Sequence, residues 1–190
     1  MKTTTILFTF LIVLISCSEN DSPVQSSFDS ENHITSNFKL NDIEIKAKSE
    51  DSTLRLKQIQ SNDISYDGYA ESWQFKFSAP QDSAIYSKYY LVSSYYDKIQ
   101  SDSTFIDETT DGDAYISENW LNSDKIMAIA ENNGGKEFRT ANTSIQISAY
   151  LSEAVIPSSV PIWTIRYIAI DMRDKYFLIR INGVTGGIIE

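Results

Sequence analysis

The sequence has few of the residues on which most catalytic and metal sites depend. Its 190 residues include one cysteine, Cys17, and one histidine, His33. A lone cysteine excludes an intramolecular disulfide, and a zinc site built without cysteine or histidine is unusual. His33 lies in a polar stretch that we expect to be a tether, so no His base is expected in the folded body. The sequence therefore predicts a non-enzymatic protein that holds no cofactor.

Basic residues are also in deficit. The chain has 16 Lys and Arg residues against 26 Asp and Glu residues, a net charge of −10. Proteins that hold nucleic acid or anionic lipid headgroups by electrostatics need basic patches. We therefore expect no nucleic-acid partner, and we expect any attachment to a membrane to have another cause.

The N-terminus has the features of a secretion leader. Lys2 supplies a positive charge, and Ile6 to Ile15 form an apolar run that is too short to span a bilayer. Residues 1–16 are therefore predicted to be a signal peptide. The sequence Leu14-Ile-Ser-Cys17 resembles the lipobox of bacterial lipoproteins, which implies acylation of Cys17, with palmitate for example, and cleavage before it. Several acyl chains anchor a protein firmly, so Cys17 is predicted to hold this chain on the membrane.

A polar segment follows the lipidation site. Residues 17–37 are rich in Ser, Asn, Asp and Glu and cannot bury enough apolar surface to offset the entropy of ordering, so we expect a flexible tether. Ser18 follows Cys17 where lipoproteins retained at the inner membrane carry Asp. This resembles lipoproteins sorted to the outer membrane, on its periplasmic or its outer side.

The body of the chain contains an internal echo. Trp163 lies 90 residues after Trp73, Lys175 lies 87 residues after Lys88, and Ile145-x-Ile147 lies 91 residues after Leu54-x-Leu56. The order of these landmarks is kept, and loop insertions absorb small differences in spacing. The echo predicts a duplicated unit, at 38–105 and 117–190, with an acidic linker at 106–116 between the copies.

Each copy shows the pattern of one helix followed by antiparallel strands. Trp73, Phe75 and Phe77 alternate with polar residues, as in a strand with one buried face, and Trp73 and Trp163 are predicted core residues. We expect an α+β fold of two tandem units, each with its own helix packed on a three- or four-stranded sheet. The expected helices cover about 41–48 and 122–133, and the expected strands lie near 54–56, 73–77, 89–92, 98–100, 145–151, 163–169, 175–181 and 187–190.

The second copy resembles the PepSY-like family. The resemblance lies in Gly134-Gly-Lys-Glu-Phe-Arg139, in Trp163-x-Ile-Arg-Tyr167 and in Tyr176-Phe-Leu-Ile-x-Ile-Asn-Gly-Val-Thr-Gly186. It implies a cystatin-like fold for each unit and suggests restraint of a peptidase, because propeptides of this family fold against their proteases. Asn182 and Gly187 stand where family members commonly have acidic residues, so no role of those carboxylates carries over.

Two further patterns are candidate sites. Asp107, Asp111 and Glu118 are spaced as in a calcium-binding EF-hand loop, although no helix is predicted before them, and the alternative is a solvated linker. The second pattern is a tyrosine cluster that can contact a partner protein or pack in half-buried hairpins. Its members are Tyr86, Tyr89, Tyr90, Tyr95 and Tyr96.

The sequence thus favours a lipid-anchored envelope protein that binds or restrains another exported protein, with peptidase inhibition as the named form. The alternative is a module that binds an ion or a small molecule through the acidic linker at 106–116.

Overall fold

The computed structural model describes residues 32–79, 86–108, 115–116, 119–153 and 160–189. Among these residues no helix is long and apolar enough to cross a membrane. The chain folds as helices and strands in the order α1 (Leu40–Glu50), β1 (Arg55–Ser61), β2 (Ser72–Ser78), β3 (Tyr86–Tyr95), β4 (Ile99–Glu108), α2 (Ser123–Ala130), α3 (Lys136–Thr140), β5 (Ile145–Glu153), β6 (Pro161–Ala169), β7 (Met172–Asn182) and β8 (Ile188–Ile189).

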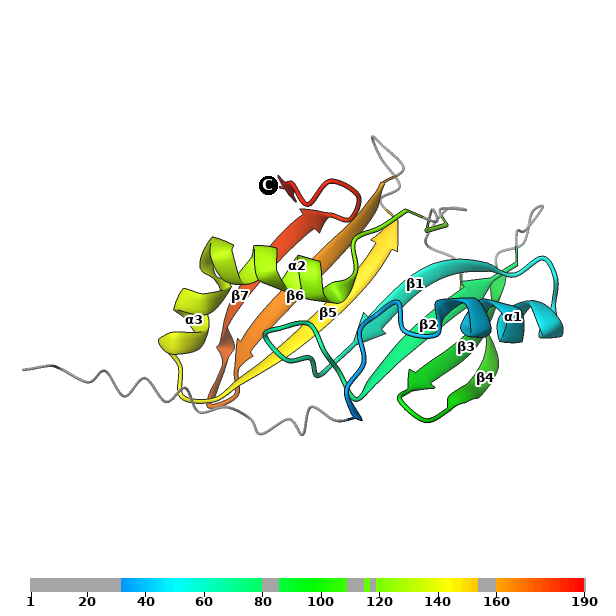
Figure 1. Cartoon of the computed structure of the whole chain (residues 1–190), viewed down its shortest axis with the longest axis horizontal. Helices are drawn as coiled ribbons and strands as arrows, with labels where there is room; N and C mark the ends of the chain where they lie inside the picture. Colours follow the sequence, from blue (N-terminus) through cyan, green and yellow to red (C-terminus); the bar gives the residue numbers. More distant parts are fainter. Residues whose placement is uncertain (1–31, 80–85, 109–114, 117–118, 154–159, 190) are drawn as a thin grey trace, which may run out of the picture.

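The strands form one eight-stranded sheet in the order β4-β3-β2-β1-β5-β6-β7-β8. Every neighbouring pair is antiparallel, and β1 pairs with β5 at the centre (Figure 1). The prediction of two tandem cystatin-like units, each with its own sheet, is therefore wrong. The cause is the pairing of β1 with β5, because the strands that would have been the exposed edges of two small sheets satisfy each other's backbone groups.

The spacings seen in the sequence place residues at matching positions of this single sheet. A bulge between Leu56 and Gln58 gives β1 one residue more than the matching stretch of β5. The sequence distance between matching residues therefore falls from 91, between Leu56 and Ile147, to 90 further along the two strands. Gln60 and Tyr150, which lie 90 residues apart, face each other in the central β1–β5 pair. Cross-strand pairs of the two halves also match. Leu56–Phe77 in the first half corresponds to Ile147–Tyr167 in the second, and Trp73–Ser94 corresponds to Trp163–Ile181.

One hydrophobic core runs under both halves. Ile43 and Ala47 of α1 belong to the same buried cluster as Ile126 and Met127 of α2. Trp73 and Trp163 are fully buried, as predicted, and their rings meet edge to face at 6.0 Å. The two halves therefore share their largest side chains across the central strand pair.

The folded region begins earlier than the sequence predicted, because residues 34–36 of the expected tether are part of the core. Ile34 is buried and forms a bridge with Ala70. Its carbonyl accepts the indole N–H of Trp73 at 2.9 Å. Ser36 is buried and exchanges hydrogen bonds with Ser123 at the start of α2: each backbone N–H donates to the other hydroxyl oxygen, at 3.0 and 3.1 Å. This reciprocal bonding fixes the N-terminal segment to the second half of the chain.

The end of the second helix is a kink rather than a stop. The sequence predicted termination at Asn133-Gly134-Gly135, and Gly134 does adopt a left-handed φ of 110°. The chain then resumes as α3, so that Phe138 packs on Phe177 of β7 with ring centres 6.3 Å apart. The helix pair thereby covers β6 and β7 on the core side (Figure 1).

A partly buried ion pair holds this kinked helix on the sheet. The Arg139 guanidinium donates to Glu131 at 2.9 Å, and the Tyr167 hydroxyl donates to the other Glu131 oxygen at 3.0 Å. Burial, and then the Glu131 carboxylate, raise the pKa of Tyr167. Arg139 and Tyr167 both bond to Glu131 and so join the kinked helix to β6, which indicates a structural role.

Candidate binding face

The sheet has one covered face and one face that none of the described helices covers. Along β2, Trp73 and Phe75 are buried, whereas Gln74 and Lys76 point the other way and are half-buried. The helices pack on the side of the tryptophans, and Figure 1 shows α1 and α2 in front of the strands. We call the other side the open face. Its side chains include Gln58, Gln60, Gln74, Lys76, Ser93, Tyr95, Ser148, Tyr150, Ser152, Thr164, Arg166, Tyr176, Leu178 and Arg180.

A single cross-strand row runs over the open face through all eight strands. Residues directly opposite each other in an antiparallel sheet point to the same side. The central Gln60–Tyr150 pair therefore continues in both directions as one line of mainly polar side chains. The row reads Gln100, Ser93, Gln74, Gln60, Tyr150, Thr164, Arg180 and Ile189.

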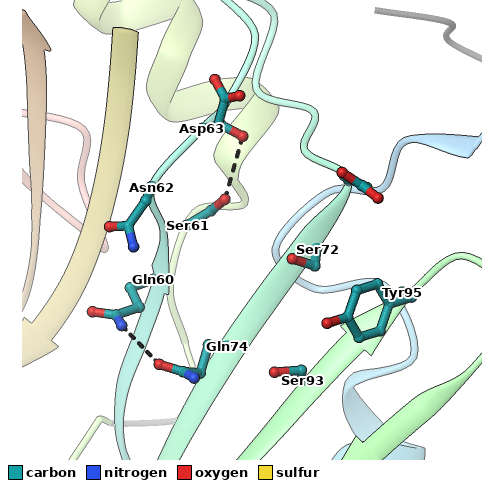
Figure 2. Close-up of a pocket in the computed structure, with 9 residues that line it drawn as sticks. Gln60, Ser61, Asn62, Asp63, Ser72, Gln74, Ser93 and Tyr95 are labelled. Atoms are coloured by element: carbon teal, nitrogen blue, oxygen red, sulfur yellow. Dashed lines mark hydrogen bonds between the residues drawn. The ribbon is translucent and has the colours of Figure 1, made fainter.

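Three glutamines in the first half of the face form a hydrogen-bonded chain. The Gln58 amide donates to Gln60 at 2.6 Å. The Gln60 amide in turn donates to Gln74 at 2.8 Å, and Figure 2 shows this second bond. Each side chain is half-buried. Because the amides orient one another, this part of the face presents fixed donors and acceptors, which costs a ligand less ordering entropy than mobile side chains would.

The glutamines border a pocket at the end of β1. Its volume is about 370 Å³, and all nine lining residues carry polar side chains. Figure 2 shows Gln60, Gln74, Ser93 and Tyr95 around it. Burial, followed by repulsion from Glu71, raises the pKa of the Asp63 carboxyl, while His33 lowers it. The lining residues are Gln60, Ser61, Asn62, Asp63, Glu71, Ser72, Gln74, Ser93 and Tyr95.

His33 is therefore close to the folded body, in contrast to its predicted place in the tether. It acts on Asp63 through its charge. In the described pocket, the Ser61 hydroxyl donates to the backbone carbonyl of Asp63 at 3.4 Å, not to a general base. The arrangement can hold polar groups of a ligand by hydrogen bonds.

The second half of the open face has a different chemistry. Tyr150, Tyr176 and Leu178 leave 38%, 55% and 45% of their surface exposed. Arg166 and Arg180 lie between them and are exposed as well. We call these five residues the arginine–tyrosine patch. Tyrosine and arginine are the side chains that most often contribute binding energy at protein interfaces.

The predicted tyrosine cluster does not form one surface. Tyr90 is in the core and its hydroxyl donates to Ser101 at 2.7 Å. Tyr89 is buried, with the Lys76 ammonium 3.6 Å from its ring centre. Tyr95 lines the pocket, and Tyr96 is half-exposed and stacks on Phe38. The side chain of Tyr86 lies outside the described residues.

The other predicted sites fall largely outside the described part of the chain. Asp111 and Glu118 of the calcium pattern are not described, and Asp107 lies in β4, opposite Ser87, so the linker is shorter than predicted. Ile116 is buried and donates its N–H to the Leu56 carbonyl at 2.9 Å. Within the described ranges no group of three or more His, Cys, Asp or Glu residues could hold a metal ion. Cys17 lies before the first described residue.

No protein-family model, curated protein or solved structure matches this chain.

Proposed function

We propose that this chain is a non-enzymatic lipoprotein of the bacterial cell envelope that binds another exported protein through its open face. The lipobox resemblance supports an anchor at Cys17, and Ser18 supports placement at the outer membrane. The single observation that carries the binding role is the sheet face that no described helix covers, with its row of side chains across all eight strands.

The size of the face suits a protein partner. The seven strands β1 to β7 each have at least seven residues; at about 4.8 Å apart they are roughly 29 Å wide, and seven residues at about 3.3 Å each are roughly 23 Å long. The resulting area of roughly 670 Å² is within the range of about 600–1,000 Å² that one partner contributes to a standard interface. A sheet backed by a packed core also changes little on binding, which favours affinity.

Peptidase inhibition is the specific form of this role that the PepSY-like resemblance supports. An inhibitor needs only to occupy its target, and the open face offers a rigid surface without catalytic groups. If this form is right, the mature protein slows an envelope metalloprotease at stoichiometric concentration. If it is wrong, binding to a partner persists without any effect on proteolysis.

Affinity capture from envelope extracts tests the proposal. We expect the mature chain to enrich a specific exported protein, and we expect Tyr150→Ala with Tyr176→Ala to abolish that enrichment. The matched control is Tyr69→Ala with Ile45→Ala, which removes two exposed side chains away from the open face. Capture that is lost equally in both variants, or in neither, contradicts binding at this face.

The pocket beside the glutamine chain favours a second candidate, a module that binds a small polar ligand; the ion-binding form of this candidate would use the acidic linker at 106–116. The pocket volume of about 370 Å³ lies within the range of small-ligand sites. Calorimetry with calcium tests the ion form: heat of binding and a raised melting temperature would support it. The absence of both would remove it.

A further inference from the structure

The arginine–tyrosine patch differs in charge from the chain that carries it. The protein has a net charge of −10, yet Arg166 and Arg180 are the charged residues at the paired positions of the open face on β5, β6 and β7. The described ion pairs involve other basic residues, Lys48, Lys125 and Arg139. Among the described residues, no carboxylate oxygen lies within 4.0 Å of the exposed guanidinium groups of Arg166 and Arg180.

The two arginines are diagonal neighbours on adjacent strands. Arg166 faces Leu178, and Arg180, two residues further along β7, faces Thr164. Diagonal neighbours in an antiparallel pair are about 7–8 Å apart. The Arg166 guanidinium lies 5.1 Å from the ring centre of Tyr176, a cation–π contact that limits where this group points.

We propose that this patch recognises an acidic, extended segment of the partner, with carboxylates at alternate positions; this inference rests on the proposed function. Side chains two residues apart on an extended chain lie on the same side and about 6.6 Å apart, which matches the separation of the arginines. Each guanidinium can donate two parallel hydrogen bonds to a carboxylate. Tyr150 and Tyr176 flank the arginines and supply apolar surface that excludes water from these bonds.

Polypeptide carboxylates suit the patch better than nucleic-acid phosphates do. Binding to a phosphate backbone needs many basic groups, because each contact releases counterions and binding weakens steeply with salt. The chain offers two arginines here within an acidic whole. A pair of directed contacts fits two carboxylates on one strand.

Fluorescence polarisation with three labelled twelve-residue peptides tests the proposal. They alternate Thr with Glu, Thr with Gln, and Thr with Lys, and the mature chain is used in non-ionic detergent at low salt. We expect the Thr–Glu peptide to bind, and the other two to bind at least about tenfold more weakly. Arg166→Gln with Arg180→Gln should raise the Kd of the Thr–Glu peptide at least about tenfold.

The matched control is Lys48→Gln with Lys125→Gln, which removes the same charge from the two helices, on the other side of the sheet. We expect its Kd to stay within about twofold of the original. An equal loss in both variants would show that only net charge matters and would overturn the proposal. Failure of the Thr–Glu peptide to bind would also overturn the proposal. Binding of anionic vesicles instead of the peptide, with the same dependence on the two arginines, would overturn it as well.

A different outcome separates this inference from the proposed function. If the Thr–Gln or Thr–Lys peptide binds better, and Tyr150→Ala with Tyr176→Ala removes that binding, the open face binds polypeptide without selecting carboxylates. The acidic partner would then be wrong and the proposed function would stand. A dimer that dissociates in the double arginine variant would make a second copy of this chain the partner and contradict a separate acidic protein.

Discussion

Truncation of Trp73 to alanine probes whether the sheet behaves as one body. The indole is fully buried, donates its N–H to the Ile34 carbonyl at 2.9 Å, and meets Trp163 at 6.0 Å. Removing a buried aromatic side chain costs about 3–5 kcal/mol through lost burial and the cavity left behind. The Ile34 carbonyl still accepts the Ala70 N–H at 3.0 Å, so loss of the indole donor adds little to this cost.

This loss is large compared with the total stability of a small domain, about 5–15 kcal/mol. Urea unfolding should therefore show a midpoint far below that of the original protein. Because Trp73 and Trp163 are in contact across the centre, hydrogen exchange should accelerate in β5 and β6 as well as in β1 and β2. Two independent units would instead confine the acceleration to the half that carries the mutation.

Two comparisons make the result interpretable. Trp73→Phe keeps a ring but loses the N–H, so it should cost clearly less than the alanine change. A double-mutant cycle between Trp73 and Trp163 should give a coupling of about 0.5–1.5 kcal/mol. Zero coupling, or exchange that changes only in β1 to β3, would refute the shared core.

Three further predictions follow from single residues. Gly68→Ala should lower stability by at least about 1 kcal/mol, since φ is 91° and the new Cβ would lie 2.5 Å from the Ser123 carbonyl oxygen; Gly187→Ala, whose new Cβ would lie in ordinary contact 3.4 Å from the Thr185 hydroxyl oxygen, should change the melting temperature little. Asp63→Asn should stabilise the fold at neutral pH, because burial and Glu71 raise the folded pKa above 3.8 and make the charged form costly. That gain should shrink as the pH falls through the folded pKa towards about 4, and an unchanged gain in acid would contradict it. Cys17→Ser should abolish lipid labelling and release the protein or leave its leader uncut, whereas normal processing with continued membrane retention would show another anchor.

The strands themselves could be predicted from alternation and spacing, because their one-sided burial is local. Trp73 to Phe77 and Trp163 to Tyr167 were placed correctly on strands with buried tryptophans. The joining of the halves could not be predicted in this way, because pairing between β1 and β5 depends on contacts about 90 residues apart in the chain. Nothing in either strand alone distinguishes an exposed edge from a central position.

The open face could be predicted only in part. Gln74 and Lys76, and Thr164 and Arg166, alternate with buried residues, so their shared direction within each strand was visible in the sequence. The row that links them is a property of register across β1 and β5. The separation of Tyr89 and Tyr90, in contrast, could be predicted from alternation alone, because adjacent residues of a strand point to opposite faces, here of β3.

Site-specific photo-crosslinking in living cells tests most directly whether the open face is the binding surface. A benzophenone amino acid would replace Tyr150, at the centre of the face, and in a second strain Tyr69, away from it; both side chains are exposed to a similar extent, 38% and 41%. We expect one discrete crosslinked exported protein from position 150 and none from position 69. Crosslinks from position 69 alone, or from neither position in cells that make the protein normally, would contradict binding through the open face.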